Sequence, residues 1–198
     1  MSLPTTLTVA SFALFASLPI LQTPPPVSPP PQVEEVKVEE VTEEEPKTIT
    51  CNGCSEKENT TLTFFYNRGI TDRNALATLM GNIKQESMFI TNICEGGARV
   101  PYSNCHRGGY GLIQWTTVNR YDGLGRHAKK IGKAPELLET QLSYLVTEYQ
   151  WKKVEPKFKT PGKSINQYMK YAYTWLGWGV HGARTNYAHD YRNRIVIA

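Results

Sequence analysis

The chain has 198 residues, of which 40% are hydrophobic and 11% aromatic, so its composition excludes a wholly disordered chain. Its formal net charge is +4, but residues 1–50 hold nine of the 13 prolines and seven of the 18 acidic residues. Residues 51–198 carry 20 Lys and Arg against 11 Asp and Glu, a net charge of +9, which suits an anionic polymer such as bacterial cell wall or nucleic acid. Because no recognised nucleic-acid-binding motif accompanies this charge, we expect no nucleic-acid partner.

Residues 1–22 form an apolar leader whose hydrophobic stretch runs from about residue 7 to residue 21. The stretch is too short and too interrupted by Ser, Thr and Pro to predict a membrane span. It is similar to the hydrophobic part of a secretory signal, although no Lys or Arg precedes it. Three interpretations stay open: an export signal or uncleaved anchor, an apolar tail that docks into a larger assembly, and a disordered leader. Any membrane contact is expected only through these residues.

Residues 23–50 have the composition of a linker. The stretch from 23 to 32 is polyproline-rich and predicts a semi-rigid, extended spacer. The stretch from 33 to 47 combines Val with clustered Glu, which favours a solvated spacer over a core element. The alternative is that its negative charge binds a basic partner, including the basic part of the same chain. We therefore expect one folded domain over residues 51–198.

Helical periodicity dominates that domain. A helix over residues 61–68, with Phe64 and Phe65 buried, is expected to end at Gly69. Thr71 is a good N-cap for the next helix, which reaches residue 86 and carries a stripe of apolar residues: Leu76, Leu79, Met80 and Ile83. Further helices are predicted over residues 116–131, over 135–151, after a cap at Ser164, and over 183–195. The pattern predicts a mainly α, single domain with at most a small β-element.

Glu86 lies on or beside the apolar face of its helix, near the end of that helix. A carboxyl group there is partly desolvated, which disfavours its charged form and raises its pKa. A carboxylic acid that is protonated near neutral pH is what glycosidic bond cleavage needs as its general acid. The alternative is a carboxylate that reaches solvent or pairs with Lys84 or Arg107.

Three segments carry a resemblance to a known family: GNIKQES at residues 81–87, GGYGLIQWT at 108–116 and YAYTWLGWGVHGARTNYA at 171–188. Together they resemble the phage tail lysozyme family, within the lysozyme-like superfamily that includes goose-type lysozymes and lytic transglycosylases. The last segment is similar to an aromatic helix followed by a turn and an Arg-bearing helix. The resemblance covers residues 61–195 and implies an α+β, lysozyme-like fold that degrades peptidoglycan, with Glu86 as the catalytic acid.

The resemblance also suggests substrate-binding roles in the second segment. Gln114 would orient water or sugar through its amide, and Tyr110 and Trp115 would offer ring faces to sugars, although Trp115 could equally pack in a core. Gly111, like Gly109, would allow close approach of the glycan or only a turn. A second carboxylate normally serves as base or nucleophile, and Glu95 is the low-ranking candidate for it.

The four cysteines allow three disulfide pairings or one four-thiolate zinc site. We favour local disulfides, Cys94 with Cys105 and Cys51 with Cys54. The first of these would hold the segment that delivers Gln114 near Glu86. The histidines show no metal-ligand spacing, and neither a metal nor a cofactor is expected.

These observations favour a glycoside hydrolase that cleaves the glycan strand of peptidoglycan, acting as a muramidase of a phage. It would be tail-associated in the virion, in contact with tail or baseplate proteins, or it would be an endolysin exported to the periplasm or cell wall. One alternative is a lytic transglycosylase with the same site. The other is a non-catalytic wall-binding or tail-structural module.

Overall fold

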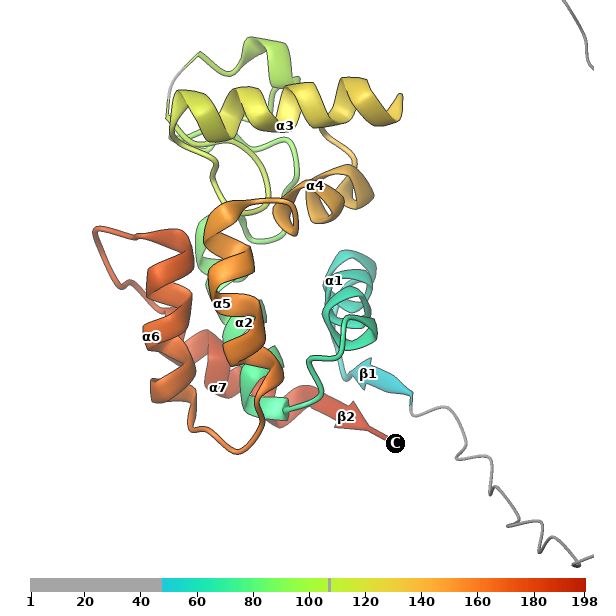
Figure 1. Ribbon diagram of the computed structural model, residues 1–198, viewed down its shortest axis with the longest axis vertical. Coiled ribbons are helices and arrows are strands. Elements are labelled where there is room, and N and C mark those ends of the chain that lie inside the picture. Colours follow the sequence, from blue (N-terminus) through green and yellow to red (C-terminus); the bar gives the residue numbers. More distant parts are fainter. Residues whose placement is uncertain (1–47, 107) are drawn as a thin grey trace, which may run out of the picture. The chain divides into compact units, whose positions relative to one another are not determined.

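The computed structural model describes residues 48–106 and 108–198, so the expectations for the apolar leader and for residues 23–47 of the linker lie outside it. This part of the chain contains seven α-helices, a short 3-10 turn at Tyr102–Asn104 and one small sheet (Figure 1). The mainly α prediction with a small β-element is therefore confirmed. In chain order the helices are α1 (Glu56–Asn67), α2 (Arg73–Ser87), α3 (Val118–Ile131), α4 (Leu138–Leu145), α5 (Tyr149–Lys159), α6 (Ile165–Leu176) and α7 (Arg184–Arg194).

The sheet joins the two ends of the described fold. Strand β1 (Ile49–Cys51) pairs antiparallel with β2 (Ile195–Ile197), with Ile49 opposite Ile197 and Cys51 opposite Ile195. Strand β1 includes Ile49 and Thr50, which composition had grouped with the linker. None of the helices described is long and apolar enough to cross a membrane.

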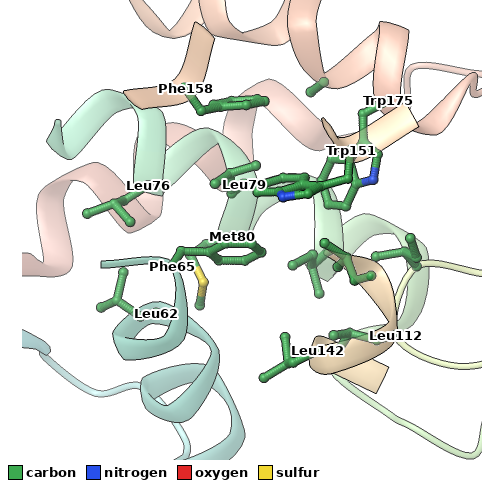
Figure 2. Close-up of a cluster of buried hydrophobic side chains, with 14 of the residues drawn as sticks. Leu62, Phe65, Leu76, Leu79, Met80, Leu112, Leu142, Trp151, Phe158 and Trp175 are labelled. Carbon is green, nitrogen blue, oxygen red and sulfur yellow. The ribbon is translucent and has the colours of Figure 1, made fainter. Parts of the chain in front are cut away.

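Helix α2 lies at the centre of the core. Ten of its 15 residues are buried, because it packs against α1, α5, α6 and α7. Figure 2 shows the surrounding cluster, in which apolar side chains from five helices and from the 108–116 segment meet. Its labelled members include Phe65, Leu79, Met80, Leu112, Leu142, Trp151, Phe158 and Trp175. The buried residues run from Ala75 to Ser87, so packing fixes the position of the helix and with it the place of Glu86 in the last turn.

Helices α2 and α7 approach each other unusually closely at Gly81. A Cβ atom at this position would lie 2.5 Å from the Ala188 backbone nitrogen and 2.9 Å from the Arg184 carbonyl oxygen. Only glycine lets the two backbones come so near. The close approach sets the first turn of α7 beside the last two turns of α2.

Two helix starts differ from the prediction. Helix α1 begins at Glu56, five residues earlier than expected, because Ser55 and Glu58 form a capping box. Helix α2 is capped by Asp72, whose Oδ1 accepts a hydrogen bond from the Ala75 N–H at 3.0 Å, and not by Thr71. Phe65 is fully buried, as expected, but Phe64 is only half-buried.

The single helix predicted over residues 135–151 is wrong. The chain forms α4 and α5 instead, with a turn between Leu145 and Tyr149. The turn directs Glu148 into the protein, where it receives hydrogen bonds from Trp115 and Arg120. Tyr149, the first residue of α5, is 76% exposed. The remaining predicted helices are confirmed as α3, α6 and α7, with Ser164 capping α6.

Candidate active site

Glu86 lies in the last turn of α2, immediately before Ser87. The helix ends at Met88, which adopts a left-handed conformation with φ of 51°. The Glu86 side chain is 15% exposed, so it is largely withdrawn from solvent but still reaches a surface. This partial burial agrees with its place beside the apolar stripe.

The partner of Glu86 is Arg184, in the first turn of α7. Arg184 Nη2 donates to Glu86 Oε1 at 2.6 Å, and its Nη1 donates to the Asn82 carbonyl oxygen at 3.3 Å. The guanidinium lies 4.6 Å from the centre of the Trp178 ring, and the Arg184 side chain is 5% exposed. A buried arginine in this position needs the carboxylate and the aromatic face to offset its desolvation.

The partners predicted from sequence for Glu86 do not fill this role. Lys84 points its ammonium group toward the rings of Tyr187 and Tyr191, 5.3 Å and 5.2 Å from their centres, so pairing with Lys84 is wrong. Arg107 lies outside the described residues.

Two effects act in opposite directions on the pKa of Glu86. Burial raises the pKa of the carboxyl, and the charge and hydrogen bond of Arg184 lower it. The net result is a pKa raised above the ordinary value for glutamate. The carboxyl therefore holds its proton to a higher pH than an exposed glutamate does.

The 108–116 segment is fixed against the end of α2 by hydrogen bonds. Ser87 Oγ donates to the Leu112 carbonyl oxygen at 2.8 Å, and Gln141 Oε1 accepts from the Leu112 N–H at 2.8 Å. Gly111 has φ of 72°, and a Cβ atom there would lie 2.7 Å from the Gln141 amide. Gly111 is thus required by a turn packed on Gln141, which is the second of the two roles considered for it.

Glu86 and Gln114 line the same cleft, which has a volume of about 270 Å³. The Gln114 backbone has φ of 52°, and its Nε2 donates to the Gly111 carbonyl oxygen at 3.0 Å. The α6–α7 turn forms another part of the wall, where Val180 is 80% exposed. The cleft is also lined by Ile113, Thr116, Leu176, Gly177, Trp178, Gly179 and Arg184.

Tyr110 and Trp115 are core residues, and the prediction that their ring faces meet sugars is wrong. Both side chains are fully buried. The Tyr110 hydroxyl donates a hydrogen bond to the Val100 carbonyl oxygen. Trp115 Nε1 donates a hydrogen bond to Glu148 Oε2 at 3.0 Å. The Tyr110 ring packs edge-on against Tyr102 and Tyr121, and the Trp115 ring packs against Tyr144, so both rings support the segment that carries Gln114.

Glu95 is exposed, and its Oε2 accepts a hydrogen bond from the Gly109 N–H at 3.1 Å. This contact gives Glu95 a role in closing its loop. Glu95 does not line the cleft, and among the described residues that do line it Glu86 is the only carboxylate.

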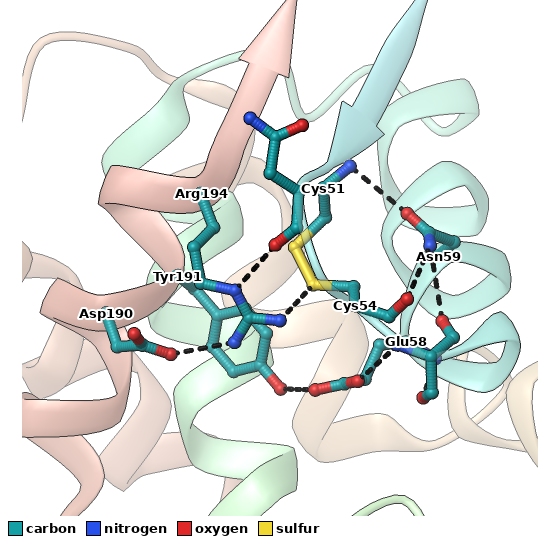
Figure 3. Close-up of a disulfide and its surroundings, with 9 residues drawn as sticks. Cys51, Cys54, Glu58, Asn59, Asp190, Tyr191 and Arg194 are labelled. Atoms are coloured by element: carbon teal, nitrogen blue, oxygen red, sulfur yellow. Dashed lines mark hydrogen bonds and ion pairs between the residues drawn. A yellow bond between two sulfur atoms is a disulfide. The ribbon is translucent and has the colours of Figure 1, made fainter.

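The cysteines form the two local disulfides, Cys94 with Cys105 and Cys51 with Cys54. The first closes the loop that leads into the 108–116 segment. The second lies between β1 and α1, where Arg194 Nη2 is 2.9 Å from Cys54 Sγ and Nη1 pairs with Asp190 at 2.8 Å (Figure 3). Arg194 thereby connects the start of the fold to the end of α7.

Sequence reasoning missed Arg184, Trp178 and Val180 as cleft residues. The one feature of the sequence that could have indicated these residues is the similarity of residues 171–188 to an aromatic helix followed by an Arg-bearing helix. Arg184 is 98 residues away from Glu86 in the sequence, and no local pattern indicates that the two side chains meet.

The model of one protein family, described as phage tail lysozyme, matches residues 56–193. The matched range starts at the first residue of α1 and ends one residue before the end of α7, so it includes Glu86, Gln114 and Arg184. Comparison with curated proteins and comparison with solved structures each gave no significant match.

Proposed function

Because the chain belongs to the phage tail lysozyme family, which supports a peptidoglycan-active role, we propose that it is a muramidase with Glu86 as its general acid. The observation that carries this proposal is a carboxyl with a raised pKa at the wall of an open cleft. A general acid must hold a proton near the working pH and remain accessible to the substrate. The raised pKa of Glu86 and its place in the wall of the cleft both favour this role.

In the proposed reaction Glu86 Oε1 accepts the hydrogen bond of Arg184, and Glu86 Oε2 carries the transferable proton. Oε2 gives the proton to the glycosidic oxygen as the bond between that oxygen and the anomeric carbon breaks. The sugar then has oxocarbenium character, and water attacks its anomeric carbon. The proton released from that water returns to Glu86, so the acid is regenerated.

The other cleft residues bind and orient the substrate. Gln114 Nε2 is held by the Gly111 carbonyl, which leaves the amide oxygen to orient a water molecule or an N–H of the sugar. Val180 and Trp178 offer apolar contact area to the sugar rings.

A second candidate is a lytic transglycosylase with the same site. It is favoured by the fact that, among the described residues lining the cleft, no second carboxylate accompanies Glu86. In that reaction a hydroxyl of the same sugar attacks the anomeric carbon, and the anhydro product is lighter than the hydrolysis product by one water molecule.

Digestion of purified peptidoglycan by the full chain, followed by mass spectrometry of the soluble fragments, tests both candidates. Hydrolysis is expected to release fragments with new reducing ends. Anhydro-muramic ends would favour the transglycosylase instead. Sedimentation of the chain with intact wall and no release of fragments would support the non-catalytic wall-binding module.

We also propose that the chain acts from the virion tail, in contact with tail or baseplate proteins, as the family description suggests. Mass spectrometry of purified virions should then detect it at a fixed ratio to tail proteins. Its presence only in the lysate of infected cells would favour an endolysin.

A further inference from the structure

A second cleft, of about 240 Å³, adjoins the first. Thr116 lines both clefts, so they meet at this residue. The wall of the second cleft includes Val118, Tyr121 and Asp122 from the first turns of α3, with Cys105 and His106 from the disulfide-closed loop. A substrate seated at Glu86 could therefore extend a branch past Thr116.

The side chains of the second cleft differ in kind from those of the first. Val118 is 75% exposed, and Asp122 is an exposed carboxylate that forms no ion pair with any described residue. One face of the Tyr121 ring is covered by Tyr102, whose ring is stacked on it at 4.3 Å with an angle of 11°. The second cleft thus presents a negative charge and an aliphatic surface, with one aromatic face already occupied.

This combination fits a peptide with a cationic side chain better than it fits a sugar ring. Sugars pack on open aromatic faces, whereas an ammonium group pairs with a carboxylate. Asp122 also places a negative charge on the surface of a domain whose net charge is +9, and this carboxylate attracts a cation locally.

We propose that the second cleft binds the stem peptide of peptidoglycan, with the Asp122 carboxylate pairing with the ammonium group of the diamino acid. This inference rests on the proposed function, because the peptide is attached to the muramic acid of the strand that Glu86 cleaves. Val118 contacts the methyl group of the alanine residue next to the sugar. The cleft would thereby favour peptide-bearing wall over bare glycan.

Binding measurements on the full chain with Glu86→Gln test the proposal without cleavage of the ligand. Three probes are compared by calorimetry: a disaccharide–peptide with a free diamino-acid amine, the same compound with that amine acetylated, and the peptide-free disaccharide. The free amine should bind about two- to five-fold more tightly than the acetylated compound, the range of an exposed ion pair. Adding Asp122→Asn should abolish this difference and leave the affinity for the peptide-free disaccharide unchanged.

Two further variants in the same background sharpen the result. Asp122→Glu retains a carboxylate and should keep most of the preference for the free amine. Glu56→Gln removes an exposed carboxylate at the start of α1 and should keep all of it.

If Asp122→Asn lost the same affinity for all three probes, the result would indicate that the second cleft binds sugar, and the proposal would be overturned. Equal affinities for the free and acetylated amines before Asp122 is changed would also overturn it. Neither outcome depends on turnover. A failure of the muramidase proposal would instead be seen as the absence of cleavage by the unsubstituted chain.

Discussion

At the scale of single residues, the proposed chemistry of the cleft depends on the protonation state of Glu86. Burial favours the neutral form of the carboxyl and raises its pKa, whereas Arg184 favours the charged form and lowers it. Since burial outweighs the guanidinium, the pKa is raised, but by less than burial would raise it without Arg184. A general acid needs this intermediate condition, because it must both hold a proton and release it.

We expect Glu86→Gln to reduce the rate of peptidoglycan cleavage by about 10²-fold or more, the scale of general acid catalysis. The amide keeps the size of the side chain and can accept the hydrogen bond of Arg184, but it has no transferable proton. Rates on purified peptidoglycan and melting temperatures are measured together. Glu95→Gln is the control, and its effect should be far smaller because Glu95 does not line the cleft. A Glu86→Gln chain that clears peptidoglycan near the original rate would disprove the catalytic assignment.

Replacement of Arg184 should change the pH dependence of the reaction in a defined direction. In the proposed mechanism activity requires protonated Glu86, so the rate should fall as pH rises through the pKa of that carboxyl. Arg184→Met removes the group that lowers this pKa, and the alkaline limb of the kcat/KM profile should therefore move to higher pH. Arg184→Lys keeps a positive charge and should shift the limb less. A limb that moves to lower pH in Arg184→Met would contradict this account of the site.

At the scale of secondary-structure elements, the close packing of α2 on α7 brings Glu86 and Arg184 together. Gly81→Ala would place a methyl group 2.5 Å from the Ala188 backbone nitrogen, so the helices would have to separate. We expect a loss of about 1–3 kcal/mol in the free energy of unfolding, the usual cost of overpacking. Urea unfolding measures this loss. Gly179→Ala is the control, since a Cβ there meets nothing within 4 Å, and its stability should stay within about 0.5 kcal/mol.

The Cys94–Cys105 disulfide is expected to stabilise the loop before the 108–116 segment. Substitution of both residues by alanine should cost about 3 kcal/mol, because the bond closes a loop with a sequence separation of 11 residues. Alanine is chosen since both positions are buried. In the unsubstituted, non-reduced chain neither thiol should react with a labelling reagent. Two freely reacting thiols would refute the bridge.

The elements with strong local signals could be predicted from sequence, and those that depend on distant contacts could not. Ser164 and the Gly132 end of α3 are local signals, and both helices lie where they were expected. The break between α4 and α5 depends on Glu148 meeting Trp115 and Arg120, which no local pattern reveals. The same distinction applies to the site: the periodicity of α2 indicated Glu86, but its partner Arg184 comes from α7.

At the scale of the whole molecule, the first and last segments of the described fold pair with each other in the β1–β2 sheet. Thr48 and Ala198 exchange two backbone hydrogen bonds, of 3.1 Å and 3.0 Å, at the end of the β1–β2 sheet. The Pro- and Glu-rich composition of residues 23–47 cannot build a hydrophobic core. Folding and cleavage should therefore depend on residues 48–198.

A chain that starts at Thr48 is expected to keep the thermal transition and the activity on wall fragments of the full chain. A chain that starts at Asn52 should be less stable, because it lacks strand β1 and the Cys51–Cys54 disulfide. The comparison of these two truncations measures the joint contribution of the sheet and the disulfide, and the comparison of the full chain with the Thr48 chain measures that of the preceding residues. Differential scanning calorimetry measures stability, and release of soluble wall fragments measures activity. If the Thr48 chain showed no cooperative transition, residues 1–47 would be required for folding and the assignment of the folded unit would be wrong.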